Sequence, residues 1–365
     1  MWVYWFMFLV PAVLAVQEHP RRIRVSWQGM PRIRIPPVWW GVLMVLTLMV
    51  GLRHQVGGDW FNYLRGFENA LDGQRYLDPD WWWNDPGYRL LQWIAMQMDW
   101  GIHGVNLLGA AVFSFGLVLF CRHLPRPWLA LVVAMPYVVT VVGMGYTRQG
   151  IALGCIMAGL VALGHGRVMK FVIWAVVGAT FHKTAVLLLP MAALAASRRR
   201  LTTWLWVGVV AAGSYVVLLQ ESVERFETSY WDAGMQSEGA FIRLLMNALP
   251  AALLLWKRER FAANLPQKQL WTWFAVVSLG LMALYFVTPS TTAVDRMALY
   301  LLPLQLLVFA YLPEALGRRD GRGNNQVWVF AVVAYYALVA FVWLNYATHA
   351  PAWLPYRFYP LEGVF

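Results

Sequence analysis

The chain contains few charged residues and almost no cysteine. Only 13% of its 365 residues are charged, whereas 60% are hydrophobic, and a soluble domain could not cover that much apolar surface. The composition therefore excludes an ordinary soluble domain and indicates an integral membrane protein. The two cysteines, Cys121 and Cys155, stand apart in apolar surroundings, which argues against a disulfide framework and a zinc site.

Several chemical motifs are missing as well. No spacing of His, Cys and Asp suggests a metal, no glycine-rich loop resembles a nucleotide-hydrolase loop, and no serine elbow is present. We therefore expect neither a metal nor a cofactor. Residues 1–16 have no basic region or small-residue cleavage site, so they are expected to be a retained first span. The net charge of +11 must be read loop by loop in a membrane protein, and we expect no nucleic acid partner.

Ten apolar stretches are candidate membrane spans, which need about 20 residues and sometimes only about 17. They are residues 1–16, 38–52, 105–120, 128–146, 149–164, 201–219, 239–256, 270–287, 297–312 and 327–347.

The loops between these stretches separate by charge. Nineteen of the 29 basic residues, with only four acids, lie in the cytoplasmic loops that the positive-inside rule predicts: 17–37, 121–127, 164–170, 197–200, 257–268 and 313–326. The larger loops 53–104 and 220–238 are acidic or mixed and are expected to face outward, as are both termini. The chain 1–365 is thus expected to form one integral membrane domain.

Two segments do not fit a simple crossing. Residues 87–98 are too few to span and have outward loops on both sides, which predicts a short helix at the outer face. Residues 171–196 are apolar but have basic residues on both flanks, which favours a re-entrant hairpin. At about 1.5 Å per residue, twelve residues place its FHKT turn roughly 18 Å into the membrane, in the outer half. The expected fold is an all-α polytopic membrane protein with about ten transmembrane helices and these two additions.

Ionisable residues gather at the outer ends of the predicted spans, and arginine dominates among them. An arginine stays charged and offers a planar fork of donors that matches carboxylate or phosphate, so the set suits a diphosphate carried on a lipid. The residues are Arg53, Asp59, Arg89, Arg148, His182, Lys183, Asp295, Arg296 and Arg357.

Arg148 and His182 each allow two interpretations. Arg148, beside Gln149, begins a span after a glycine-rich bend, where free N–H groups favour an anion, but a lone arginine can also reach toward lipid head groups. His182 has an ordinary pKa near working pH and suits a general base, but it can also be a histidine hydrogen-bonded between packed helices. Lys183 next to it can neutralise phosphate or extend to the surface.

Asp59 and the nearby aromatic residues are also ambiguous. Asp59 can bind or activate an acceptor sugar, or it can cap the helix that begins at Trp60. The tryptophans around it form either an interfacial belt or stacking surfaces for sugar rings. Asp295 and Arg296 begin another span and are expected to form an ion pair with each other.

Five motifs, in this order and spacing, resemble the EpsG family of polysaccharide-assembly membrane proteins, which are related to Wzy-type polymerases. They are RHQVGGDWFNYLRGFE, DPGYRLLQWI, RQGIALG, TFHKTAVLLLP and DRMALYLLP. The residues that match the family pattern are Arg53, Gly57, Asp59, Tyr63, Pro86, Gly87, Arg148, Gln149, His182, Thr184, Arg296 and Tyr300. Two residues depart from it: Trp60 replaces a tyrosine and Asp85 replaces a glutamate.

The resemblance implies a GT-C-like glycosyltransferase that polymerises exopolysaccharide, O-antigen or capsule repeat units in the bacterial inner membrane. Its substrate would be an undecaprenyl-diphosphate-linked oligosaccharide at the periplasmic face, and a chain-length regulator is a candidate partner besides membrane lipid. We expect His182, Asp59 and Arg148 to be catalytic. The expected substrate-binding residues are Arg53, Gln149, Lys183, Arg296, Tyr300, Tyr63 and Arg89.

Two rival classes remain open. A transporter or lipid-linked oligosaccharide flippase also needs polar residues in the membrane, but these would line a path across it, whereas here they gather on one face. An O-antigen ligase-like protein or a sugar acyltransferase fits a one-sided site equally well.

Overall fold

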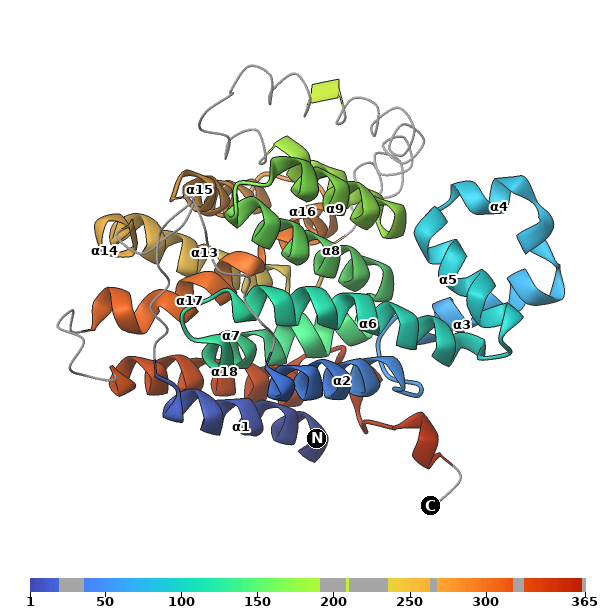
Figure 1. Cartoon of the computed structure of the whole chain (residues 1–365), viewed down its shortest axis with the longest axis horizontal. Coiled ribbons are helices and arrows are strands. Elements are labelled where there is room, and N and C mark those ends of the chain that lie inside the picture. Colours follow the sequence, from blue (N-terminus) through green and yellow to red (C-terminus); the bar gives the residue numbers. More distant parts are fainter. Residues whose placement is uncertain (20–35, 191–207, 210–235, 263–267, 318–324, 363–365) are drawn as a thin grey trace.

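The computed structural model describes residues 1–19, 36–190, 208–209, 236–262, 268–317 and 325–362. All of its named elements are helices, and most run roughly along the longest axis of the molecule (Figure 1). The first half contains α1 (Trp2–Gln17), α2 (Pro37–Gly51), α3 (Trp60–Asp72), η1 (Arg75–Leu77), α4 (Pro79–Trp83), α5 (Pro86–Gln97), α6 (Gly101–Arg122), α7 (Pro127–Ala134), η2 (Met135–Gly143), α8 (Thr147–Gly164), α9 (Val168–Phe181) and η3 (Lys183–Leu188). The second half contains α13 (Ala240–Trp256), α14 (Arg258–Ala262), α15 (Lys268–Tyr285), α16 (Thr291–Ala298), η6 (Leu299–Leu301), α17 (Pro303–Leu316), α18 (Gln326–Tyr346), η7 (Ala350–Trp353) and η8 (Tyr359–Leu361).

The apolar helices are those of a polytopic membrane protein. Among the described residues, α6, α8 and α18 are long and apolar enough to cross a membrane, and α16 with α17 would form a fourth span, bent by 48°. Five shorter apolar helices are α1, α2, α9, α13 and the continuous helix of α7 and η2. The expected number of ten spans stays a prediction, because several helices are short and the predicted span 201–219 lies almost wholly outside the described residues, as does most of loop 220–238.

The structure describes all of one segment that did not fit a simple crossing, residues 87–98, but only part of the other, residues 171–196. The predicted outer-face helix at 87–98 corresponds to α5. In the predicted hairpin 171–196, α9 ends at Phe181, His182 is extended (φ −152°, ψ 112°), and the 3-10 turn η3 follows. The backbone therefore breaks at the predicted turn. Because residues 191–196 lie outside the described residues, the re-entrant hairpin itself stays a prediction.

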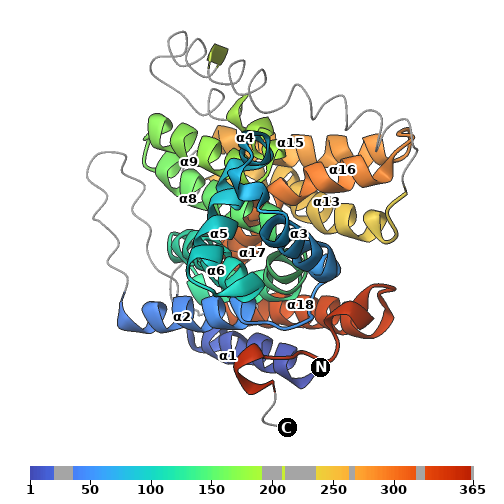
Figure 2. The same ribbon diagram turned by 90° about the vertical axis from the view of Figure 1, so that its right-hand side faces the viewer.

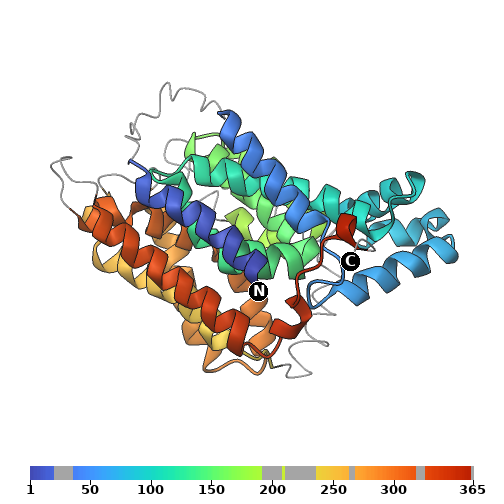
Figure 3. The same cartoon turned by 90° about the horizontal axis from the view of Figure 1, so that it is seen from below.

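Helices α3, α4 and α5 form a separate layer at one end of the helix bundle. Figure 2 looks onto this end and shows them in front of the bundle, and Figure 3 shows the same light-blue and cyan helices extending beyond the others. The N-terminus lies toward this end as well (Figure 1). The 53–104 loop of the sequence is thus mostly a small helical layer rather than irregular chain.

Glycines allow the bundle helices to pack closely. A Cβ on Gly116 of α6 would overlap the carbonyl group of Gly154 of α8, and a Cβ on Gly154 would lie 2.6 Å from the Cα of Phe113. Such backbone contact is the usual way in which small residues bring membrane helices together. It fixes α8, whose first turn contains Arg148, against α6.

Candidate active site

Arg148 is the central charged group at the α3–α5 end of the bundle. It lies in the first turn of α8, and its Nη1 forms an ion pair with Oδ2 of Asp85 at 2.5 Å. The rings of Tyr63 and Tyr88 flank its guanidinium at 5.8 and 6.0 Å. The Arg148 side chain is 40% exposed, and its buried Nε has no hydrogen-bond partner among the described residues. Asp85 therefore binds one side of the Arg148 guanidinium, and other donors of this guanidinium make no hydrogen bond with the described residues.

Asp85 reaches Arg148 because α5 packs directly on α9. Asp85 is the N-cap residue of α5 in a left-handed conformation (φ 58°), which aspartate tolerates better than most residues. A Cβ on Gly87 would collide with Thr180 and lie 3.1 Å from Cζ of Phe181, so only glycine allows this contact. The sequence predicted Asp85 only as a substitution within a motif, and its pairing with Arg148 is new.

Gln149 connects α8 to α16. Its side-chain Nε2 donates to the carbonyl oxygen of Arg296 at 3.0 Å, and its Oε1 accepts from Nη1 of Arg296 at 3.2 Å. The guanidinium of Arg296 also lies over the ring of Tyr146, 4.4 Å from its centroid. Both amide atoms of this buried glutamine are therefore used to hold one arginine, whose remaining donors have no hydrogen-bond partner among the described residues.

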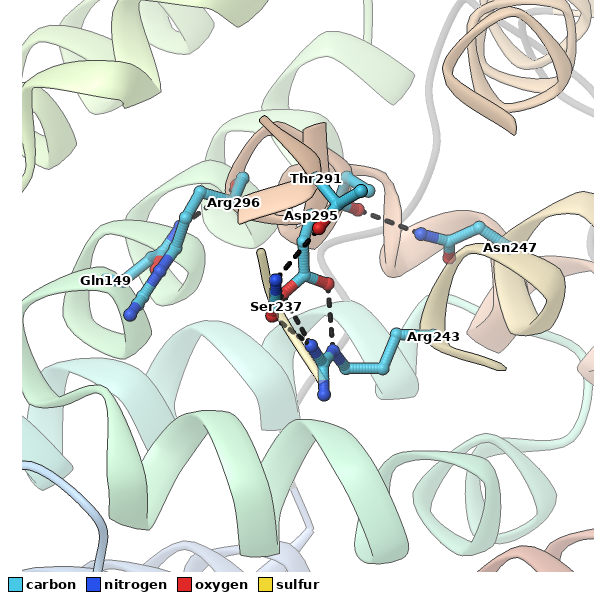
Figure 4. A network of polar contacts seen from close by, with 8 residues as sticks. Gln149, Ser237, Arg243, Asn247, Thr291, Asp295 and Arg296 are labelled. Atoms are coloured by element: carbon cyan, nitrogen blue, oxygen red, sulfur yellow. Dashed lines mark hydrogen bonds and ion pairs between the residues drawn. The ribbon is translucent and has the colours of Figure 1, made fainter. Parts of the chain in front are cut away.

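Asp295 does not pair with Arg296, contrary to the sequence-based interpretation. It forms two bonds with Arg243 of α13, at 2.8 and 2.9 Å, and accepts a further bond from the hydroxyl of Ser237 at 3.2 Å. Figure 4 shows Asp295 directed toward Arg243 and Arg296 directed toward Gln149. The prediction failed because adjacent helical residues point to different sides of the helix. The lone arginine within the predicted span 239–256 was the available sign that Arg243 has a buried partner.

His182 lies between α9 and η3, beside two hydroxyl groups. Its Nδ1 is 2.6 Å from Oγ1 of Thr184 and 3.2 Å from the hydroxyl oxygen of Tyr300, and these two oxygens are 3.3 Å apart. Nε2 has no hydrogen-bond partner among the described residues. Through Tyr300 of η6, which directly follows α16, the imidazole is linked to the part of the fold that carries Arg296.

Asp59 also belongs to this end of the bundle. It is the N-cap residue of α3, yet its carboxylate makes no capping hydrogen bond and has no partner among the described residues. Its backbone oxygen accepts from the N–H of Tyr63, whose hydroxyl in turn accepts from the N–H of Arg148 at 3.5 Å. The hydrogen bond expected of a capping aspartate is therefore not formed. Asp59 is half-buried, and its carboxylate makes no hydrogen bond with the described residues.

Three other predicted substrate-binding residues are placed differently. Arg53 is only 2% exposed and donates to Val50, Val56 and Asn106, and to Oγ1 of Thr147 at 2.9 Å. The nitrogens of the Arg53 guanidinium thus all donate within the protein, and Nη2 binds Thr147, the residue that precedes Arg148.

Arg89 is bound to its own helical layer. It donates to the carbonyl of Asn84 and to Oε1 of Gln92, and it lies over the ring of Trp81 at 4.9 Å. Burial and the charge of Arg148 lower the pKa of Arg89, but a guanidinium starts so high that it stays charged. Lys183 is half-buried and has no side-chain partner among the described residues.

The fold and this cluster define a class: an all-helical membrane protein with arginines, a histidine and carboxylates gathered at one end of the bundle. The chain belongs to the EpsG family, whose match covers residues 38–358 and so includes every residue of the cluster. The family comprises Wzy-type polymerase-like proteins, and the chain is accordingly a membrane protein of polysaccharide assembly. No curated protein and no solved structure matches the chain.

Proposed function

We propose that the chain is a polysaccharide polymerase that joins undecaprenyl-diphosphate-linked repeat units at the periplasmic face of the bacterial inner membrane. The observation that carries this proposal is the pair of partly engaged arginines, Arg148 and Arg296. Each is held on one edge, by Asp85 and Gln149 respectively, and each keeps donors without a hydrogen-bond partner among the described residues. Guanidinium forks of this kind suit a diphosphate.

The proposed reaction is a direct displacement. A hydroxyl of the incoming lipid-linked unit attacks the anomeric carbon of the growing chain, the new glycosidic C–O bond forms, and the bond between that carbon and the diphosphate oxygen breaks. The hydroxyl proton passes to a base on the protein. The electron pair of the broken bond stays on the lipid diphosphate, where Arg148 and Arg296 stabilise the developing charge. Such a displacement inverts the anomeric carbon and needs no nucleotide.

His182 is the proposed base. If Nδ1 carries its proton toward the hydroxyl oxygens of Thr184 or Tyr300, the lone pair is on Nε2, which has no hydrogen-bond partner among the described residues. Tyr300 thus orients the imidazole. Asp59 is the second candidate for the base, because its carboxylate is unengaged.

The other predicted residues receive supporting roles in this proposal. Arg53 positions the start of α8 through Thr147, Tyr63 positions the backbone of Arg148, and Arg89 holds α4 on α5. Lys183, which has no side-chain partner among the described residues, is a proposed contact to phosphate. Membrane lipid and a chain-length regulator are proposed partners, with both termini on the periplasmic side.

The experiment is to produce Arg148→Ala and His182→Ala variants in a strain that makes the polymer and to analyse both polymer and lipid-linked intermediates. The proposal predicts full membrane insertion, loss of long polymer and accumulation of single lipid-linked repeat units. Polymer of wild-type length in either variant would refute the assigned roles.

The same analysis separates the rival functions. Accumulation of finished but unligated or unmodified polymer would identify a ligase-like protein or an acyltransferase. Lipid-linked units trapped on the cytoplasmic side would identify a flippase.

A further inference from the structure

The last described segment of the chain lies against both loops that lead into the candidate site. The N–H of His54 donates to the carbonyl of Arg357 at 3.0 Å, and the N–H of Gly57 donates to the carbonyl of Ala352 at 2.9 Å. These bonds hold residues 52–58, which precede Asp59, to the segment 350–361.

Trp353 of η7 occupies the centre of this contact. It is only 2% exposed, and its indole N–H donates to the carbonyl of Thr140 at 2.8 Å. Its own carbonyl accepts from the hydroxyl of Tyr4 at 2.7 Å, and its ring meets Trp343 of α18 edge-on at 5.1 Å. This one residue therefore ties together α1, through its backbone carbonyl, and η2 and α18, through its side chain.

The indole ring also abuts the bend before Arg148. A Cβ on Gly145 would collide with Cζ2 of Trp353 and would lie 3.0 Å from Cη2, so the ring touches the backbone of this bend directly. Cη2 of the ring is also 3.5 Å from where a Cβ of Gly58 would be, which is ordinary contact. The loop and the bend also touch each other directly, because a Cβ on Gly57 would collide with the carbonyl oxygen of Met144 and lie 3.1 Å from the Cα of Gly145. Trp353 thus packs against both segments where they meet.

The bend itself needs such support. Segment η2 is a π-helix of nine residues that ends at Gly143, and π-helices are rare and mostly limited to single turns. The carbonyl of Thr140 within it is bonded to Trp353. Only Met144, Gly145 and Tyr146 lie between η2 and α8, and the glycines at 143 and 145 leave this backbone flexible, so the chain alone does little to fix where Arg148 lies.

We infer that Trp353 is a positioning residue for the reaction, which holds the loop that leads to Asp59 and the bend that leads to Arg148 in their relative positions by packing against both. This inference rests on the proposed function. It assigns to the segment 350–361 a part in the active site that no motif of the sequence indicated.

The test is a steric cycle with Gly145→Ala, Trp353→Phe and the double variant, assayed with lipid-linked oligosaccharide in membrane vesicles. Gly145→Ala forces the indole and the bend apart, and a displacement of about 1 Å at a reacting group can cost on the order of 100-fold in rate. We expect a tenfold or larger fall in kcat with little change in KM. Trp353→Phe removes the atoms that collide, so the double variant should recover at least about fivefold over Gly145→Ala.

The matched control is Gly41→Ala in α2, where a Cβ meets nothing within 4 Å. It should polymerise like the wild type. If the wild type and this control fail to polymerise, the proposed function fails, and amide hydrogen exchange still tests the inference. The N–H groups of Tyr146 and Gly150, which bond to Val142 and Tyr146 in the wild type, should exchange faster in Gly145→Ala and slow again in the double variant.

Two results would overturn the inference. One is wild-type kcat and exchange in Gly145→Ala. The other is a double variant at least as impaired as Gly145→Ala in both measurements. If Gly145→Ala does not accumulate in the membrane, Trp353→Phe alone decides: it loses the bond to Thr140, and an unchanged kcat would overturn the inference.

Discussion

The Arg148–Asp85 pair allows stability and catalysis to be separated by mutation. Arg148→Ala would remove a charge-assisted donor from the leaving diphosphate, which by analogy with the loss of one oxyanion donor costs roughly 100-fold to 1,000-fold in kcat. The same change leaves the carboxylate of Asp85, which is 8% exposed, without its cation. Losing one partner of a fully buried pair costs about 3–5 kcal/mol. Since the Arg148 side chain is 40% exposed, we expect a smaller loss, roughly 2 kcal/mol.

A second substitution distinguishes these effects. In Arg148→Ala/Asp85→Asn the stranded charge is gone, so most of the lost stability should return, whereas the polymerisation rate should stay at the level of the single variant. The free energy of unfolding is measured by denaturant titration in detergent, and the rate is measured with lipid-linked oligosaccharide in vesicles. Recovery of the rate in the double variant would refute the assignment of Arg148 to the diphosphate, because it would show that the arginine only neutralises Asp85.

Two further predictions concern the histidine cluster and the helix contact. Tyr300→Phe removes one of the two hydroxyls beside Nδ1 of His182 but leaves that of Thr184 at 2.6 Å. We therefore expect kcat to fall only about threefold to tenfold, which corresponds to one neutral hydrogen bond. Stability is measured in parallel, and an inactive variant that accumulates normally would contradict this role. Gly116→Ala places a methyl against the backbone of α8 and should destabilise the protein by about 1–3 kcal/mol in thermal unfolding. The control Gly280→Ala in α15, where an added Cβ meets nothing within 4 Å, should leave stability unchanged. Equal stability of the two variants would refute the close packing of α6 on α8.

Much of the local architecture could be predicted from the sequence. Hydrophobic length and loop charge predicted the short helix now seen as α5, and they predicted that the chain would turn near His182, where α9 ends. Residue type predicted that Arg148 would begin a helix, which it does in the first turn of α8. These features depend on neighbours in the chain, which a sequence displays directly.

Contacts between distant segments were not predictable in this way. The pairing of Asp85 with Arg148 requires α5 to dock on α9, and the pairing of Asp295 with Arg243 requires α13 to lie beside α16. Neither docking leaves a periodic pattern in either segment. The role of Trp353 was equally hidden, because a tryptophan near a membrane surface is usually interfacial and only the fold shows it packed against Gly145.

Reconstitution shows whether the chain itself joins lipid-linked repeat units. The purified chain is placed in liposomes with a polyprenyl-diphosphate-linked oligosaccharide as the sole substrate, without nucleotide sugars, and the products are separated by size while released polyprenyl diphosphate is measured. We expect a ladder of polymers with one diphosphate lipid released for each new linkage, and loss of both in Arg148→Ala. Oligosaccharide that crosses the bilayer or is transferred to another acceptor, without a ladder, would contradict it.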